Sequence, residues 1–201
     1  AVLISSPAKS HFKYIEISLK YNLYVLVEKP MVLNLNQAKK LKLNKNKNKI
    51  VVIQNWRTKP VGLALKKFIR SGKLGHVGQI FFRYIRNREN ASYSRYIFKE
   101  KLPSLYAMGI HHLDLFRYLL SDDITKINGN FYRPAWSMYS SPTSFNLNLL
   151  TKKNTFINYT STFSSLSNIH KQESLIVNGS KDTITNDSNW LEPPLYFKKK
   201  N

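Results

Sequence analysis

Residues 24–30, Tyr-Val-Leu-Val-Glu-Lys-Pro, constrain the fold of this chain more than any other stretch. A continuous apolar run of this length is typical of a strand covered on both faces, as in a parallel sheet. Pro30 ends the strand, because proline has no N–H to donate to a neighbouring strand. Glu28 and Lys29 are therefore expected at the carboxyl end of a parallel strand, where open α/β sheets bind ligands. A solvated strand end carrying two charges is the competing interpretation.

The residues around this strand alternate between strand and helix patterns. Further strands are predicted at 1–5 and 49–55, and helices at 8–20, from Asn34 or Asn36 to about 43, and at 60–71. Strands that alternate with helices need crossover connections, so this half of the chain predicts an α/β fold with a parallel sheet.

The pattern changes after Gly72, where long strands replace the alternation. One helix is predicted at 105–120, and strands at 77–86, 124–133, 145–151, 155–163 and 173–178. The segment 87–104 is polar and predicts a loop that shapes a pocket. This half therefore predicts an α+β region: an open, mainly antiparallel sheet with a helix packed on it. The domain division is expected between residues 72 and 73.

The chain is strongly basic, with 32 Lys and Arg against 11 Asp and Glu and a net charge of +21. Such a charge suits a nucleic-acid partner. The basic residues are dispersed, however, and their densest run, 39–49, alternates with asparagine as a solvated helix end and loop would. A basic nucleic-acid-binding module is therefore the least favoured of the possible functions.

Composition also limits the chemistry of the chain. There is no cysteine, which excludes disulfides, iron–sulfur clusters and zinc–thiolate sites. No metal site is predicted. No apolar run approaches the roughly 18 residues that a membrane-spanning helix needs, so no membrane association is expected.

A second polar cluster, Gly109-Ile110-His111-His112-Leu113-Asp114, lies in the helix predicted at 105–120. In an α-helix, positions 107, 111 and 114 share one face. A histidine beside a carboxylate on one face can act as an oriented general base. A histidine capped by its own helix neighbours is the alternative.

Taken together, these motifs resemble the glucose–fructose oxidoreductase / inositol dehydrogenase (Gfo/Idh/MocA) family. The resemblance covers nearly the whole chain and is strongest at Glu28-Lys29-Pro30 and at the Gly-x-His-x-x-Asp pattern that begins at Gly109. The matching motifs, in order, are Ser5-Ser6-Pro7 with His11, residues 25–30, Asn55-Trp56-Arg57, residues 71–75 with 77–80, and Gly109 to Asp114.

The resemblance implies an NAD(P)-dependent oxidoreductase that transfers a hydride between a nicotinamide cofactor, NAD or NADP, and a sugar, polyol or related hydroxy compound. Residues 1–72 would be the C-terminal part of a Rossmann dinucleotide-binding domain. Residues 73–201 would form an α/β domain for substrate binding and for homo-oligomer formation through its sheet. A cytoplasmic location is expected.

The resemblance also implies roles for individual residues. Lys29 would lie by the nicotinamide and the reacting oxygen, and His111 would exchange the proton of the substrate hydroxyl. His112 and Asp114 are expected to contact the substrate. The proline of the motif often follows a cis peptide bond in the family. The residues expected to contact the cofactor are Ser6, Pro7, His11, Glu28, Lys29, Pro30, Trp56 and Arg57.

The sequence departs from the family pattern in two ways. The glycine-rich turn that approaches the cofactor pyrophosphate is not in this sequence, which begins about midway through the Rossmann half, so activity is expected of a longer chain. Many members carry aspartate four residues before the active-site histidine, where this chain has Ala107. A non-catalytic or degenerate relative that retains the scaffold is therefore the second hypothesis.

Overall fold

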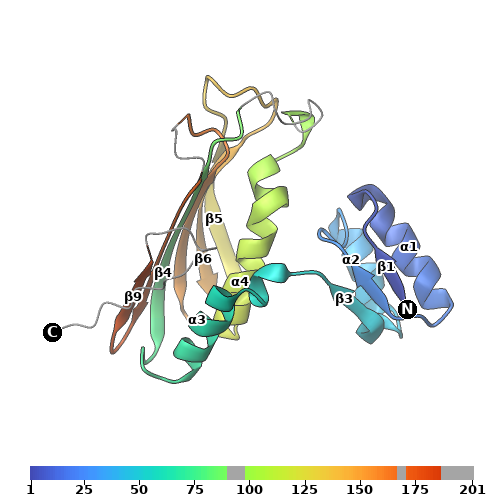
Figure 1. Cartoon of the computed structure of the whole chain (residues 1–201), viewed down its shortest axis with the longest axis horizontal. Coiled ribbons are helices and arrows are strands. Elements are labelled where there is room, and N and C mark those ends of the chain that lie inside the picture. Colours follow the sequence, from blue (N-terminus) through green and yellow to red (C-terminus); the bar gives the residue numbers. More distant parts are fainter. Residues whose placement is uncertain (90–97, 167–170, 187–201) are drawn as a thin grey trace. The chain divides into compact units, whose positions relative to one another are not determined.

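The computed structural model of the chain describes residues 1–89, 98–166 and 171–186 (Figure 1). It divides into two compact units, Ala1–Asn55 and Trp56–Asn201. Each unit has a hydrophobic core of its own. No helix among the described residues has the length and apolar character that crossing a membrane would need.

The first unit is a small parallel sheet with helical connections, as the alternating pattern predicts. The strands β1, β2 and β3 lie in that order, with Val2 opposite Val25 and Val25 opposite Ile50. Its elements are β1 (Val2–Ile4), α1 (Ala8–Lys20), β2 (Val25–Val27), α2 (Leu35–Leu43), the 3₁₀ turn η1 (Lys47–Lys49) and β3 (Ile50–Val52). The central strand β2 therefore leads directly into Glu28-Lys29-Pro30.

Local sequence explains where these helices begin and which face they bury. Asn34 caps α2, because its side chain accepts a hydrogen bond from the backbone N–H of Gln37. Ile15 and Leu19, four residues apart on α1, are buried against the sheet. The buried core of this unit consists of Ile4, Ile15, Leu19, Val25, Val27 and Leu41.

The second unit is a six-stranded sheet in the order β5-β6-β7-β4-β8-β9. The pairing of β4 with β7 is parallel and the other pairings are antiparallel, which confirms the mainly antiparallel prediction. Its strands are β4 (Val77–Arg86), β5 (Ile124–Tyr132), β6 (Ser144–Thr151), β7 (Phe156–Thr162), β8 (Lys171–Gly179) and β9 (Thr183–Asn186). Strand β9 is not among the strands predicted from the sequence.

Helices α3 (Pro60–Arg70) and α4 (Ile110–Leu120) cover one face of this sheet (Figure 1). Alternate residues of β4 point to the covered face, so Ile80, Phe82 and Tyr84 are all buried. Phe82 meets Phe116 of α4 with ring centroids 5.5 Å apart. The residues between them in sequence point to the uncovered face, where Phe81 is 38% exposed.

The helix predicted at 105–120 begins with a π-helical turn, η4 (Leu105–Gly109), and is α-helical only from Ile110. A π-helical turn holds more residues than an α-helical turn, so it shifts the phase of every position before Ile110. Ala107 and His111 are four residues apart, which is close to one full turn in either geometry, so the prediction that Ala107 shares a face with His111 and Asp114 stays a prediction. Ala107 is partly buried and packs against the core of the second unit.

The two compact units divide between Asn55 and Trp56, whereas the sequence pattern places the domain division after residue 72. Helix α3 lies between these positions, and its Val61 and Leu65 belong to the core of the second unit. Where the domains of the protein divide stays a prediction. Of the predicted loop at 87–104, residues 90–97 lie outside the described residues.

Candidate active site

In the first unit, the candidate site is the edge of the parallel sheet at the carboxyl ends of its strands. Two backbone hydrogen bonds continue the sheet there, from Glu28 N–H to Ile4 O and from Ile53 N–H to Val27 O, both 2.9 Å. Ser5-Ser6-Pro7 follows β1 and Glu28-Lys29-Pro30 follows β2. The parallel register therefore brings the two predicted cofactor-binding motifs to the same edge.

Glu28, Lys29 and Pro30 are all half-buried at this edge. The Lys29–Pro30 peptide bond is cis, as it often is in the family. The backbone N–H of Lys29 donates to Oε2 of Glu28 at 3.2 Å, so the carboxylate partly holds the backbone that carries the lysine. The structure thus places a lysine side chain at the end of the central strand, within reach of solvent.

His11, on the first turn of α1, joins the two motifs. It is only 1% exposed, and its ring nitrogens face two backbone carbonyls. Nδ1 lies 2.8 Å from Pro30 O, and Nε2 lies 2.6 Å from Ser6 O. The same loop is also held by Ser6 Oγ and Ser10 Oγ, 2.7 Å apart, and by the hydrogen bond from Ser10 Oγ to Pro7 O.

This edge fits part of a nicotinamide dinucleotide. It has the location at which open α/β sheets bind such ligands, and it has polar groups and a lysine side chain to contact one. Residues 1–61 contain no glycine, so a glycine-rich turn for the pyrophosphate is not in this part of the sequence. Ser6, Pro7, Glu28, Lys29 and Pro30 lie at this edge, and their contact with the cofactor stays a prediction.

In the second unit, the candidate site is the start of α4. His111 is 7% exposed and stacks on Trp56, with ring centroids 6.4 Å apart and an interplanar angle of 20°. Gly109, just before the helix, allows a close approach to its neighbours. A Cβ there would lie 2.9 Å from Cδ1 of Leu105 and 3.5 Å from Oη of Tyr159.

His112 is fully buried behind His111. The rings of Trp56, Phe82, Tyr84 and Tyr159 surround it at centroid distances between 4.6 and 5.4 Å. Its Nδ1 lies 2.5 Å from Oη of Tyr159, and the same burial raises the pKa of Tyr159 well above its ordinary value. The geometry therefore supports a structural role for His112, and its predicted contact with substrate stays a prediction.

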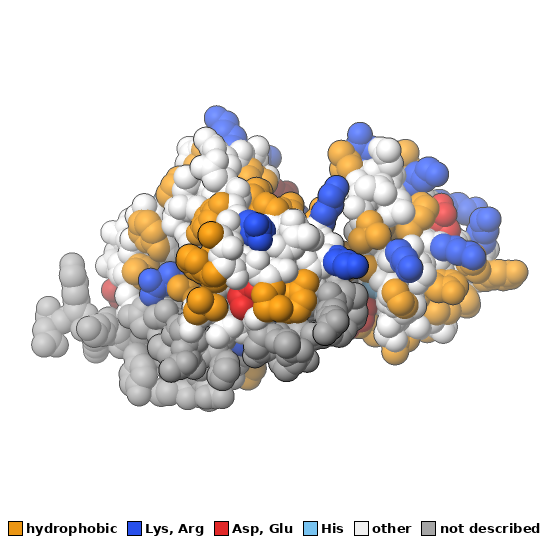
Figure 2. Space-filling view, turned by 90° about the horizontal axis from the view of Figure 1, so that it is seen from above, with side chains coloured by type: hydrophobic (Ala, Val, Ile, Leu, Met, Phe, Trp, Pro, Cys, Tyr) orange, Lys and Arg blue, Asp and Glu red, His pale blue; other side chains and the backbone are white. Residues whose placement is uncertain are grey.

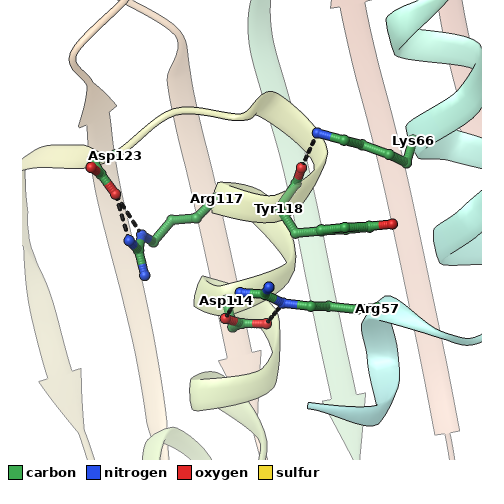
Figure 3. Close-up of polar contacts among 6 residues, drawn as sticks. All are labelled: Arg57, Lys66, Asp114, Arg117, Tyr118 and Asp123. Atoms are coloured by element: carbon green, nitrogen blue, oxygen red, sulfur yellow. Dashed lines mark hydrogen bonds and ion pairs between the residues drawn. The ribbon is translucent and has the colours of Figure 1, made fainter. Parts of the chain in front are cut away.

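Arg57 and Asp114 form a bidentate ion pair, in which Nε donates to Oδ2 at 2.6 Å and Nη2 donates to Oδ1 at 2.5 Å (Figure 3). The hydrogen bond to Asp114 raises the pKa of Arg57, although desolvation offsets part of this rise. The pair ties the segment that follows Trp56 to the helix that carries His111. From the sequence, Arg57 and Asp114 are expected to contact different ligands, and their pairing was missed because 57 residues separate them.

A hollow of about 560 Å³ lies at the other end of α4, and most of its charged groups contact the protein itself. Lys66 Nζ donates to the carbonyl oxygens of Tyr118 and Leu119, and Arg117 pairs with Asp123 (Figure 3). Burial lowers the pKa of Lys66. The charged groups that line the hollow therefore hold the C-terminal end of α4 in place. Its lining residues are Arg57, Lys66, Arg117, Tyr118, Ser121, Asp122, Asp123, Lys152 and Lys153.

The fold combines a Rossmann-type unit with an open-sheet unit, and comparison with known families agrees. Residues 1–55 match the family model described as "Oxidoreductase family, NAD-binding Rossmann fold", and residues 63–185 match the "GFO/IDH/MocA C-terminal domain". The chain therefore belongs to the Gfo/Idh/MocA family. The predicted family and fold class are confirmed, and so is a nicotinamide cofactor for the family.

Individual relatives are similar to parts of the chain or to its fold. The uncharacterized oxidoreductase YhhX of Escherichia coli K12 is 36% identical over 118 residues, which are 56% of this chain and 33% of YhhX. This chain thus spans about a third of that curated relative.

Two solved structures share the fold. An oxidoreductase from Agrobacterium radiobacter in complex with NAD+, L-tartaric acid and magnesium aligns with a TM-score of 0.82 and 18% identity, over 92% of this chain and 54% of that one. The scyllo-inositol dehydrogenase of Lactobacillus casei with bound NAD(H) and scyllo-inositol aligns with a TM-score of 0.74 and 19% identity, over 92% and 56%.

Proposed function

We propose that the protein is a nicotinamide-dependent oxidoreductase that transfers a hydride between NAD or NADP and a carbinol carbon of a sugar, polyol or related hydroxy compound. The observation that carries this proposal is the placement of Lys29. It lies half-buried at the carboxyl end of the central parallel strand, in a chain whose two units both match the family. A polyol substrate is supported by the fold neighbour crystallised with scyllo-inositol.

The mechanism follows from the charge that develops during the reaction. When bound, the nicotinamide supplies the hydride acceptor. His111 removes the hydroxyl proton of the substrate, since an imidazole can exchange protons near neutral pH. The ammonium group of Lys29 stabilises the alkoxide that forms on the substrate oxygen. Trp56 and the Arg57–Asp114 pair hold the start of α4, and so fix the position of His111.

Exchanging Lys29 in the longer chain that carries the glycine-rich turn tests this proposal. Lys29→Met keeps most of the side-chain stem and removes the charge, which should lower turnover of a polyol panel about a hundredfold or more. Lys13→Met, on the exposed side of α1, makes the same chemical change and should leave turnover as in the parent. Turnover of Lys29→Met within a few-fold of the parent would contradict the proposal, and Lys29 would then be a solvated charge at the end of the strand.

The alternative, a non-catalytic relative, draws on Ala107, which stands where many family members carry aspartate. It would take precedence if the longer chain, with its glycine-rich turn, reduced neither NAD nor NADP with any sugar or polyol of a broad panel. A nucleic-acid-binding role has less support. Figure 2 shows Lys and Arg side chains on the viewed face as separate groups among apolar and neutral ones. A cytoplasmic location stays a prediction.

We also propose that copies of the chain associate through the uncovered face of the second unit's sheet. Phe81 and Phe156 are 38% and 36% exposed on adjacent strands of that face. Beside them, Asn158 Nδ2 donates to Asn148 Oδ1 at 2.9 Å, so these two polar side chains of the face are already paired. Sedimentation should show a dimer or larger species, and Phe81→Asp should shift it to a monomer. A parent that sediments as a monomer contradicts the proposal.

A further inference from the structure

His11 is the most deeply buried polar side chain at the candidate cofactor edge of the first unit, with 1% of its surface exposed. Burying an imidazole costs free energy unless its nitrogens are hydrogen-bonded. Both ring nitrogens are within hydrogen-bond distance of backbone carbonyls, Nδ1 of Pro30 at 2.8 Å and Nε2 of Ser6 at 2.6 Å. The two carbonyls belong to different loops, which follow β1 and β2.

The chemistry of the ring suits a bridge between these loops. Its two nitrogens point away from each other, and both face carbonyl oxygens, which only accept; the doubly protonated ring donates to both carbonyls, whereas the neutral ring donates to one of them. Pro30 has no N–H, so its carbonyl is the only backbone group through which hydrogen bonding can fix that residue. The contact with His11 is therefore a direct constraint on the segment that carries Lys29.

We propose that His11 is a positioning residue, which holds the Lys29–Pro30 segment against the loop after β1 through the Pro30 carbonyl. Its importance for the reaction rests on the proposed function, in which Lys29 is the cation beside the substrate oxygen. The hydrogen bonds among Ser6, Pro7 and Ser10 hold the loop after β1 without His11. Among the described contacts, His11 is thus the link from that loop to Pro30.

Two substitutions separate the two contacts. The side-chain nitrogen of asparagine takes the place of Nδ1, and that of glutamine takes the place of Nε2. His11→Asn should therefore keep the hydrogen bond to Pro30, whereas His11→Gln should keep the one to Ser6 and lose the other. Hydrogen–deuterium exchange of peptides covering residues 5–7 and 28–33 reads the two loops separately and does not depend on activity.

We expect exchange in residues 28–33 to rise on the order of tenfold in His11→Gln, the loss of about one hydrogen bond, and to stay within about twofold of the parent in His11→Asn. Because both variants lose the imidazole, a side chain that only fills the core would give equal changes in both. Equal changes, or no change in either, would overturn the proposal. If the parent turns over no polyol, the proposed function fails while this exchange result stands.

A measurement on the unaltered protein covers the case in which neither variant folds. The Nδ1 proton of His11 should exchange slowly enough with water to be seen by NMR, with a through-space contact to the residues next to Pro30. Absence of a protected ring proton at Nδ1 would contradict the proposed bridge.

Discussion

The two units hold their candidate reactive side chains in different ways. In Ala1–Asn55, Lys29 lies on a loop, and the contacts around it go to backbone groups: Glu28 Oε2 accepts from the lysine N–H, and His11 contacts Pro30 O. In Trp56–Asn201, His111 lies on a helix that is fixed by side chains, through Trp56 and the Arg57–Asp114 pair. The loop is therefore held through its backbone, by one neighbouring side chain and one from α1, whereas the helix is held through its side chains.

The two units also differ in the size of their hydrophobic cores. Six apolar residues are buried in the first, and 22 among the described residues of the second. The small sheet therefore buries few apolar side chains, and its loops are held mainly by polar contacts. The large sheet can enclose a polar histidine, His112, within a shell of aromatic rings.

The largest expected effect tests whether the units are separate in stability. Phe82→Ala removes a ring packed on Phe116, His112 and Tyr159, and should lower the free energy of unfolding of the second unit by about 3–5 kcal/mol. All three tryptophans lie in residues 56–201, so their fluorescence in a denaturant titration reports on this unit. Ile15→Ala, in the first core, should leave the tryptophan transition in place. An equal shift in both variants would mean that the units unfold as one.

The second prediction concerns the ion pair that holds α4. Asp114→Asn should destabilise the second unit by about 1–2 kcal/mol, because it removes a charge-assisted pair whose carboxylate is 14% exposed. Asp123→Asn makes the same change in the Arg117 pair, whose carboxylate is 69% exposed, and should cost less than about 0.5 kcal/mol. Both losses come from the same fluorescence titrations. Equal losses would mean that the Arg57–Asp114 pair stabilises the unit no more than the exposed Arg117–Asp123 pair does.

Ala107 gives a third prediction, on activity. Ala107→Asp should raise polyol turnover by about tenfold or less, because a carboxylate near the start of α4 would orient the reacting groups without transferring a proton itself. Ala107→Asn has a similar size without the charge and should not raise turnover. Ala107 packs against the core, so both variants should lose some stability, and kcat is compared on folded protein. If both raise turnover alike, charge is not the cause.

The smallest expected effect is a pH dependence of the second unit. Burial raises the pKa of Tyr159, so above about pH 10 the unfolded chain loses a proton that the folded chain keeps. Stability should therefore fall as pH rises above this value. Tyr159→Phe should flatten that fall, and at neutral pH should cost about 1 kcal/mol for the lost contact with His112.

Tyr14→Phe, in the first unit, is the control, because Tyr14 is 45% exposed. It should leave the alkaline slope of the stability curve unchanged. If Tyr159→Phe shows the same slope as the parent in urea titrations at several alkaline pH values, the buried phenol does not contribute.

The difference between the units also explains what the sequence could predict. The position of Lys29 follows from an apolar run ended by Pro30, both local signals, and local sequence narrowed the start of α2 to Asn34 or Asn36, of which the structure has Asn34. The Arg57–Asp114 pair could not be predicted, because no local pattern joins residues 57 positions apart. The π-helical turn at Leu105–Gly109 was missed for a related reason: an α-helical spacing and a π-helical one differ by about one residue per turn.

The burial of His112 was missed as well, since the sequence shows two adjacent histidines and not which one the sheet encloses. The structure decides this through strand register, which brings Phe82 opposite Tyr159 and both against α4. His111 is left at the helix start beside Trp56.

The most direct test of the proposed mechanism measures turnover of NAD and NADP with scyllo-inositol and a wider polyol panel in four forms of the longer chain that carries the glycine-rich turn: the parent, Lys29→Met, His111→Ala and the double variant. We predict a loss of about a hundredfold or more in each single variant. The double variant should lose little beyond the worse single one, because both groups act on the same proton-transfer step. An active parent with either single variant within a few-fold of it would contradict the central claim.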